Sequence, residues 1–164
     1  MKYNFHGIRT LTNKHLASYT VLPSHKIIKN KYMIKNNNQL TITTDRDSVC
    51  AGDDCRSHNA EFSIKSSCTI IELLKAAWQT SPLASISGGK ATWLIDISSN
   101  IGEWMCIGVM AEQWTHPRLT IPEETTVEEL FKDQKLSLYF RYWCQIDPEI
   151  VYESVRLGQP LPKK

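Results

Sequence analysis

The first carboxylates of the sequence come as a group of four aspartates: Asp45, Asp47, Asp53 and Asp54. Calcium loops place oxygen ligands at alternate positions and add a bidentate glutamate further along the chain. The segment Val49-Cys50-Ala51 divides this group, so its spacing does not match a calcium loop. Two other interpretations stay open, a solvated loop and a binding surface for a basic partner. We expect the binding surface, with all four aspartates as partner contacts.

Four soft metal ligands fall in the same part of the chain: Cys50, Cys55, His58 and Cys68. Structural zinc sites use four such ligands, usually in close pairs with about two to four residues between them. The step from Cys55 to His58 fits that rule, but there is no Cys-x-x-Cys pair and two aspartates interrupt the loop. The spacing therefore favours no bound metal and no other cofactor, and these four residues are the zinc set to compare with the structure.

The sequence contains no linear catalytic motif. The segment Ser87-Gly88-Gly89-Lys90 fails as a phosphate-binding loop, because Ala84 replaces the first glycine of that motif and Ala91 follows the lysine. The five histidines are scattered, and GxSxG, HExxH and glycine-rich dinucleotide patterns do not occur. We therefore expect no catalytic residues and a protein that is not an enzyme. A small nuclease or hydrolase without a linear motif stays as an alternative.

The charges are unevenly distributed along the chain. Residues 1–44 contain seven basic side chains and no acidic one, whereas residues 45–164 contain 12 basic and 17 acidic side chains, a net charge of −5. We expect a basic N-terminal segment of uncertain structure over residues 1–38 and one folded domain over 39–164. Lysines and tyrosines in residues 1–35 suit nucleic acid, which gives a second functional alternative, a nucleic-acid-associated accessory protein.

The compartment is indicated by two negative observations and by the cysteines. The N-terminus builds no apolar core of a signal peptide, and no run approaches the length of a membrane span. The five cysteines are an odd number, and two of them fall in apolar or aromatic runs, which favours reduced thiols over a disulfide framework. We expect a cytoplasmic protein that does not contact membranes.

Three segments carry the start signals of helices. Thr69 and Glu72 have the spacing of a capping box and precede an apolar stripe. Thr125 or Thr126 precedes a second helix, predicted over 127–133. Asp147 followed by Pro148 predicts a third, with aspartate as the N-cap and proline in the first turn.

Strands are predicted where apolar and polar residues alternate. Leu40, Ile42 and Thr44 begin the first, and others are expected at Phe62–Ile64, 91–97, 104–110, 118–121 and 136–143. Runs 91–97 and 104–110 are apolar on both faces, which predicts a central hairpin covered on both sides. We expect an α+β fold, a mostly antiparallel sheet with about three helices packed on it, β-grasp-like over 39–97. Trp114 lies between strands in a polar setting and is the tryptophan we expect at a binding surface.

In its size, its acidic run Asp45–Asp54 and its acidic body, the chain resembles the small immunity proteins of bacterial contact-dependent and polymorphic toxin systems. The resemblance is one of type, because such proteins share no signature motif. It implies a non-catalytic protein that inhibits a cognate bacterial toxin, such as a nuclease, by direct protein–protein contact. An acidic inhibitor would complement the basic cleft with which a nuclease binds polyanions.

Overall fold

The computed structural model describes residues 38–50, 54–100, 103–131 and 135–164. The chain divides into two compact units, residues 1–35 and 36–164, and every described residue belongs to the second unit. The predicted division into a basic segment over 1–38 and one folded domain over 39–164 stays a prediction. The nucleic-acid alternative rests on residues 1–35, which lie outside the described residues, so it stays a prediction.

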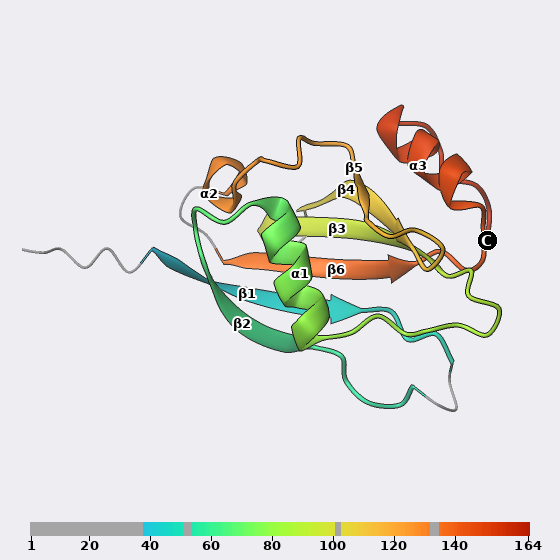
Figure 1. Cartoon of the computed structure of the whole chain (residues 1–164), viewed down its shortest axis with the longest axis horizontal. Coiled ribbons are helices and arrows are strands. Elements are labelled where there is room, and N and C mark those ends of the chain that lie inside the picture. The colour runs from blue at the N-terminus through green and yellow to red at the C-terminus, as the bar shows by residue number, and fades with distance from the viewer. Residues whose placement is uncertain (1–37, 51–53, 101–102, 132–134) are drawn as a thin grey trace, which may run out of the picture. The chain divides into compact units, whose positions relative to one another are not determined.

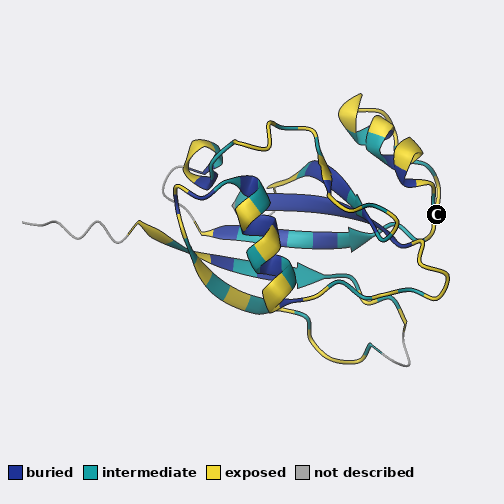
Figure 2. Cartoon of the chain, in the orientation of Figure 1, coloured by how far each residue is buried: buried dark blue, intermediate teal, exposed yellow. Residues whose placement is uncertain are grey.

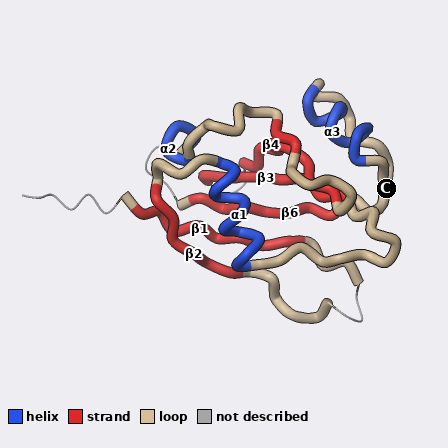
Figure 3. Tube along the Cα trace, in the orientation of Figure 1, coloured by secondary structure: helices blue, strands red, loops and turns tan. Residues whose placement is uncertain are grey.

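Six strands and three helices make up the described part of the chain (Figure 3). The strands are β1 (Gln39–Arg46), β2 (Ala60–Lys65), β3 (Thr92–Asn100), β4 (Glu103–Ala111), β5 (Arg118–Leu119) and β6 (Leu136–Tyr142). The helices are α1 (Ile70–Thr80), α2 (Val127–Leu130) and α3 (Pro148–Arg156). None of these helices is long and apolar enough to cross a membrane.

All six strands join in one sheet with the order β2-β1-β6-β3-β4-β5 (Figure 1). Neighbouring strands are antiparallel, with the exception of the parallel pair β1 and β6. The predicted α+β fold with a mostly antiparallel sheet is therefore confirmed. The hairpin β1–β2 is followed by the helix α1, and the last strand, β6, pairs in parallel with β1. This is the connectivity of a β-grasp. The sequence indicated it from residues 39–97, whereas β6, which completes it, lies beyond that range.

Helix α1 begins where the capping box predicted. The Thr69 hydroxyl accepts a hydrogen bond from the Glu72 amide at 3.3 Å, and the Glu72 carboxylate accepts from the Thr69 amide at 2.9 Å. These two bonds satisfy amide groups that the first turn of a helix leaves unpaired. The helix then turns its apolar stripe toward the sheet, as the dark blue side in Figure 2 shows.

The core between α1 and the sheet is built from alternate residues of the central strands. Ile42 of β1, Trp93 and Ile95 of β3 and Phe140 of β6 are completely or almost completely buried there, together with Leu73 of α1. Removing each such side chain from water contributes about 1.5–3 kcal/mol to folding. This layer is the main hydrophobic core of the body.

Helix α3 packs on the opposite face of the same sheet. The neighbouring strand residues Leu94 and Val109 form a second, smaller cluster with Val151 of α3. Asp147 caps this helix by accepting a hydrogen bond from the Glu149 amide at 2.9 Å, as the sequence predicted. Because α3 is nine residues long, this cluster is small and involves only part of the second face.

The central hairpin differs from the prediction at its outer strand. β3 is covered on both faces as expected, and it continues past Ser98 to Asn100, where a loop was predicted. At the start of β4, however, Trp104 and Met105 are 52% and 47% exposed. β5 has two residues instead of the predicted four and pairs only with Gly108 and Val109, so this end of β4 has no β5 residue beside it. α2 is also shorter than predicted, because Phe131 at its end adopts an extended backbone.

We expect Gly108→Ala to destabilise the folded domain, because β5 lies very close to β4 at this residue. A Cβ atom at Gly108 would meet the carbonyl oxygen of Arg118 and lie 2.8 Å from Leu119 Cδ2. The overlap should reduce the free energy of unfolding by about 1–3 kcal/mol in urea denaturation. The control Ser63→Ala, at an exposed position of β2, should change it by less than about 0.5 kcal/mol. Equal stability of the two variants would contradict this close approach.

Candidate partner-binding groove

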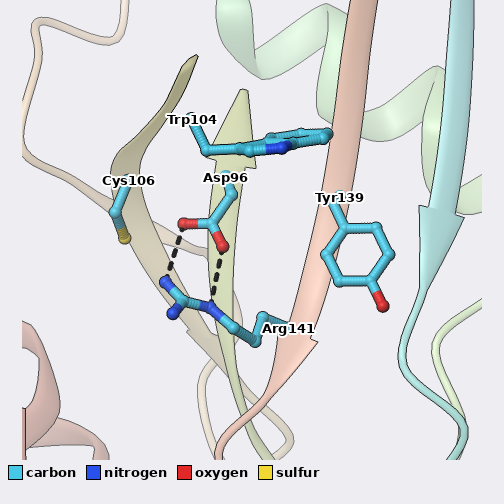
Figure 4. A pocket seen from close by; sticks show the side chains of 5 residues that line it. All are labelled: Asp96, Trp104, Cys106, Tyr139 and Arg141. Atoms are coloured by element: carbon cyan, nitrogen blue, oxygen red, sulfur yellow. Dashed lines mark hydrogen bonds and ion pairs between the residues drawn. The ribbon is translucent and has the colours of Figure 1, made fainter. Parts of the chain in front are cut away.

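The second face of the sheet carries an open groove of about 530 Å³. It is lined by Asp96 of β3, Trp104 and Cys106 of β4, and Tyr139 and Arg141 of β6 (Figure 4). None of these five positions was predicted from the sequence as part of a site. We call this feature the groove.

Strand register brings the groove residues together. Asp96 lies directly across from Tyr139 on one side and from Cys106 on the other, so the three form a row over β6, β3 and β4. Trp104 and Arg141 lie two positions along from members of that row, and side chains two apart on a strand share a face. A β-bulge before Asp96 lets Ile107 enter the core while Cys106 stays on the groove face.

The groove floor is an ion pair between Asp96 and Arg141. Arg141 Nη2 donates to Asp96 Oδ1 at 3.1 Å, and Nε lies 2.9 Å from Oδ2 (Figure 4). Asp96 is 5% exposed, so this carboxylate depends on its partner for compensation of its charge. The pair makes the floor electrically neutral.

Two aromatic rings form the upper wall of the groove. Trp104 and Tyr139 meet edge to face, with 5.9 Å between their ring centroids. The Tyr139 hydroxyl donates to Asp47 Oδ1 at 2.5 Å. Burial raises the pKa of Tyr139, and the bond to Asp47 and the charges of Asp47, Asp45 and Asp96 raise it further. Burial is the larger cause of this shift, and three carboxylates, Asp47, Asp45 and Asp96, add to it.

Cys106 is the one thiol on the groove lining. Burial raises its pKa to about 12, and the negative charge of Asp96 adds to the shift. The thiol therefore stays protonated at neutral pH, where a cysteine nucleophile needs the thiolate form. Its Sγ lies 3.5 Å from the carbonyl oxygen of Gly108, within donating distance.

The four predicted aspartate contacts are not equivalent in the structure. Asp54 and Asp47 are occupied by internal partners, and Asp53 lies outside the described residues. Asp47 accepts from Tyr139 and from the Tyr142 amide at 2.9 Å. Asp45 is half-buried, and its Oδ1 accepts from the next backbone amide. The loop therefore does not present its described carboxylates as one free surface, and their contact with a partner stays a prediction.

Asp54 links the loop to the body through Arg46. Its carboxylate accepts from Arg46 Nη1 at 2.7 Å and Nη2 at 3.0 Å, and from the Val49 amide at 3.0 Å. His58 Nε2 lies 2.6 Å from Oδ1. The hydrogen bond from Arg46 is the main cause that lowers the pKa of Asp54 to about 2. Since Arg46 also donates to the carbonyl oxygen of Pro82, the pair connects β1, the loop and the segment after α1.

Trp114, the predicted tryptophan contact, is only partly accessible. Trp114 is partly buried against the α3 cluster, and the Arg118 guanidinium lies 4.3 Å from its ring centroid. Trp104, which was not predicted as a contact, is more exposed, and the contact of Trp114 with a partner stays a prediction. Packing between distant segments, and not only the polarity of neighbours in the chain, decides how far each indole meets water.

The proposed zinc set is not assembled. No three histidine, cysteine, aspartate or glutamate side chains among the described residues lie close enough to hold a metal ion. Cys68 is buried in the α1 core, where burial raises its pKa to about 11, while Cys50 and Cys55 are exposed and His58 faces Asp54. The four residues thus serve different parts of the fold.

Comparisons with protein-family models, with curated proteins and with solved structures found no match to this chain. The site is therefore interpreted from its own geometry.

The Asp54–Arg46 pair should make stability depend on acid pH. Because folding lowers the pKa of Asp54 to about 2, the ionised group stabilises the fold above its unfolded pKa near 4, and this contribution is lost as the pH falls toward 2. We expect Asp54→Asn to lower the melting temperature at pH 7 and to flatten its decline between about pH 4 and 2. Thermal denaturation followed by circular dichroism over this range measures both effects.

A suitable control is Glu153→Gln, which removes a partner of Arg156 from an exposed pair on α3. Exposed ion pairs contribute little, so its melting temperature should stay close to that of the unchanged chain. If Asp54→Asn showed the same acid profile as the unchanged chain, the structural role of Asp54 would be refuted.

Proposed function

We propose that this chain is a non-catalytic immunity-type protein that inhibits a cognate bacterial toxin by direct contact, and that the groove is the centre of its contact surface. The proposal joins the resemblance in charge and size to a surface that the sequence did not reveal. Trp104, 52% exposed at the mouth of the groove, is the single observation that carries it.

An exposed tryptophan beside a hollow is the typical anchor of a protein interface. Aromatic residues and arginine dominate binding energy at interfaces, and they cluster where a partner side chain fills a pocket. The groove supplies this combination through Trp104, Tyr139 and Arg141. Tyr139 is held by Asp47 and Arg141 by Asp96, so both side chains are fixed in place before any partner arrives. A surface ordered in advance loses less entropy on binding.

The charge around the groove suits a basic partner. Arg141 compensates Asp96, whereas Asp45 and Asp47 form no ion pair within the described part of the chain. The balance of these four groups is negative. Complementary charge speeds the encounter of two proteins, and a nuclease toxin offers a basic surface because its substrate is a polyanion.

The chemistry of the groove supports binding over catalysis. A nucleophile or general base needs a pKa close to the working pH. The pKa values of Cys106 and Tyr139 are both raised, which keeps the two groups protonated, and Asp96 is engaged by Arg141. The polar groups of the groove therefore fix its shape and charge, as in a recognition surface.

Substitution of Trp104 tests the contact surface directly. We expect Trp104→Ser to weaken binding to the toxin encoded beside this gene by about 2 kcal/mol or more, roughly thirtyfold in Kd, and to reduce protection of cells that express the toxin. Isothermal titration calorimetry with the purified toxin measures the affinity. Leu157→Ser is the matched control, since Leu157 at the end of α3 is equally exposed and lies outside the groove.

The outcome that contradicts the proposal is a Trp104→Ser variant that is folded and binds the toxin as tightly as Leu157→Ser does. Circular dichroism and thermal denaturation establish that both variants are folded.

Asp45→Asn tests the electrostatic part of the proposal. Because Asp45 has no cation partner in the described chain, its removal should lower the association rate severalfold at low salt and weaken the salt dependence of that rate. The dissociation rate should change little. Stopped-flow association at several salt concentrations measures this, with Glu61→Gln as the control, because Glu61 is already paired with Lys135. An unchanged association rate would remove Asp45 from the encounter surface.

A further inference from the structure

The outer edge of β4 lacks a neighbouring strand over half its length. β3 pairs with β4 from Glu103 to Ala111, but on the other side β5 pairs only with Gly108 and Val109. One more bond, from the Thr120 amide to the Ile107 carbonyl at 2.8 Å, extends that contact by one residue. Among the described residues, no strand pairs with the outer side of 103–106, which we call the β4 edge. An unpaired strand edge is a template for an incoming strand.

The β4 edge lacks the usual protection of exposed strands. Natural edges are commonly blocked by lysine, proline or inward-pointing charge. Here the exposed side chains are one carboxylate, Glu103, and two apolar groups, Trp104 and Met105. Because successive residues of a strand point to opposite faces, one of the two apolar groups stands on each side of the sheet. Exposed apolar side chains around open backbone groups favour the addition of a strand.

The opposite edge of the sheet provides an internal comparison. β2 is also an edge strand, but its outward side chains are Glu61, Ser63 and Lys65, which are charged or polar and exposed. Such residues keep an edge in water and discourage pairing. The β4 edge differs from β2 in exposing two large apolar side chains beside its one carboxylate, and it adjoins the groove through Trp104.

The charge at the groove restricts what can enter beside the β4 edge. Asp45, Asp47 and Asp96 all act on the Tyr139 ring, and Arg141 compensates only one of these three carboxylates. The exposed face of Trp104 attracts a cation through its π electrons. A lysine or arginine side chain that lies across Trp104 toward Tyr139 meets both conditions, whereas an acidic side chain would be repelled.

We propose that the β4 edge takes up an extended segment of the protein partner as an additional strand, which places a lysine or arginine in the groove and an apolar side chain against Met105. Because neighbouring residues of a strand face opposite sides, the segment carries the basic and the apolar residue next to each other. The inference rests on the proposed function, to which it adds the partner's conformation and chemistry. Backbone hydrogen bonds supply affinity, and the basic residue supplies specificity.

The test uses linear peptides selected from a random displayed library on the full chain. We expect selected peptides to share a basic residue next to an apolar one and to compete with one another for one site. Met105→Lys should weaken their binding by about tenfold or more, because a lysine there protects the edge as in natural sheets. Leu157→Lys, an equally drastic change on α3, should alter it by less than about twofold.

Two further measurements separate strand addition from contact with the groove alone. N-methylation of alternate peptide amides removes the ladder hydrogen bonds, so it should abolish binding while the side chains stay the same. Amide hydrogen exchange of Glu103–Cys106 should slow on binding. Exchange in β2, the polar edge, should stay unchanged and serves as the internal control.

The possible failures are distinguishable. One failure is peptide binding that is weakened by Trp104→Ser but unchanged by Met105→Lys and by N-methylation of the peptide. That result overturns strand addition and leaves the groove as the contact surface. Toxin binding that is insensitive to Trp104→Ser overturns the proposed function itself. The inference is also overturned if the selected peptides are acidic, or if Met105→Lys weakens the binding of none of them. Self-association of the chain that depends on Met105 overturns it as well, because the β4 edge would then bind a second copy of the chain.

Discussion

The parallel pairing of β6 with β1 is the interaction on which both faces of the body depend. β6 enters the sheet between β1 and β3, so it joins the first hairpin to the second. Its residues Leu138 and Phe140 complete the core under α1. Tyr139 and Arg141, which alternate with them along the strand, line the groove on the other face. One strand thus supplies the centre of the hydrophobic core and two of the five groove residues. A strand slip by one residue would exchange these two sets.

Asp47 fixes the register of that pairing at the end of β1. Its amide donates to the Phe140 carbonyl at 2.9 Å, and its carboxylate accepts from the Tyr142 amide and the Tyr139 hydroxyl. The same carboxylate that terminates the strand pair therefore orients the tyrosine of the groove. In a similar way, the Asp54 carboxylate holds the loop to β1 by accepting two hydrogen bonds from Arg46. Acidic residues that look like a surface feature in the sequence are in these two cases structural groups.

The asymmetry of the sheet edges connects the fold to its proposed use. β2 ends the sheet with polar and charged side chains, and β5 covers β4 only at Gly108 and Val109. The close approach at Gly108 holds β5 against the second half of β4. The first half of β4, which contains Trp104, lies beside the groove. Trp104 belongs both to the unpaired edge of β4 and to the lining of the groove, so the edge and the groove adjoin each other. Under the proposed function, this open groove receives part of a protein partner, and its titratable groups fix its shape because they are engaged or protonated.

By itself the sequence determined the features that depend on near neighbours in the chain. The capping box of Thr69 and Glu72, the Asp147 cap and the alternation in β1 are set by residues within about four positions of one another, and all three were predicted correctly. Only the tertiary structure decided the site. Asp47 and Tyr139 are 92 positions apart, and Trp104 lies on the groove face of β4 beyond a β-bulge that local sequence does not reveal. Local patterns carry no information on which distant strands pair, because that choice is made by the burial of many side chains at once.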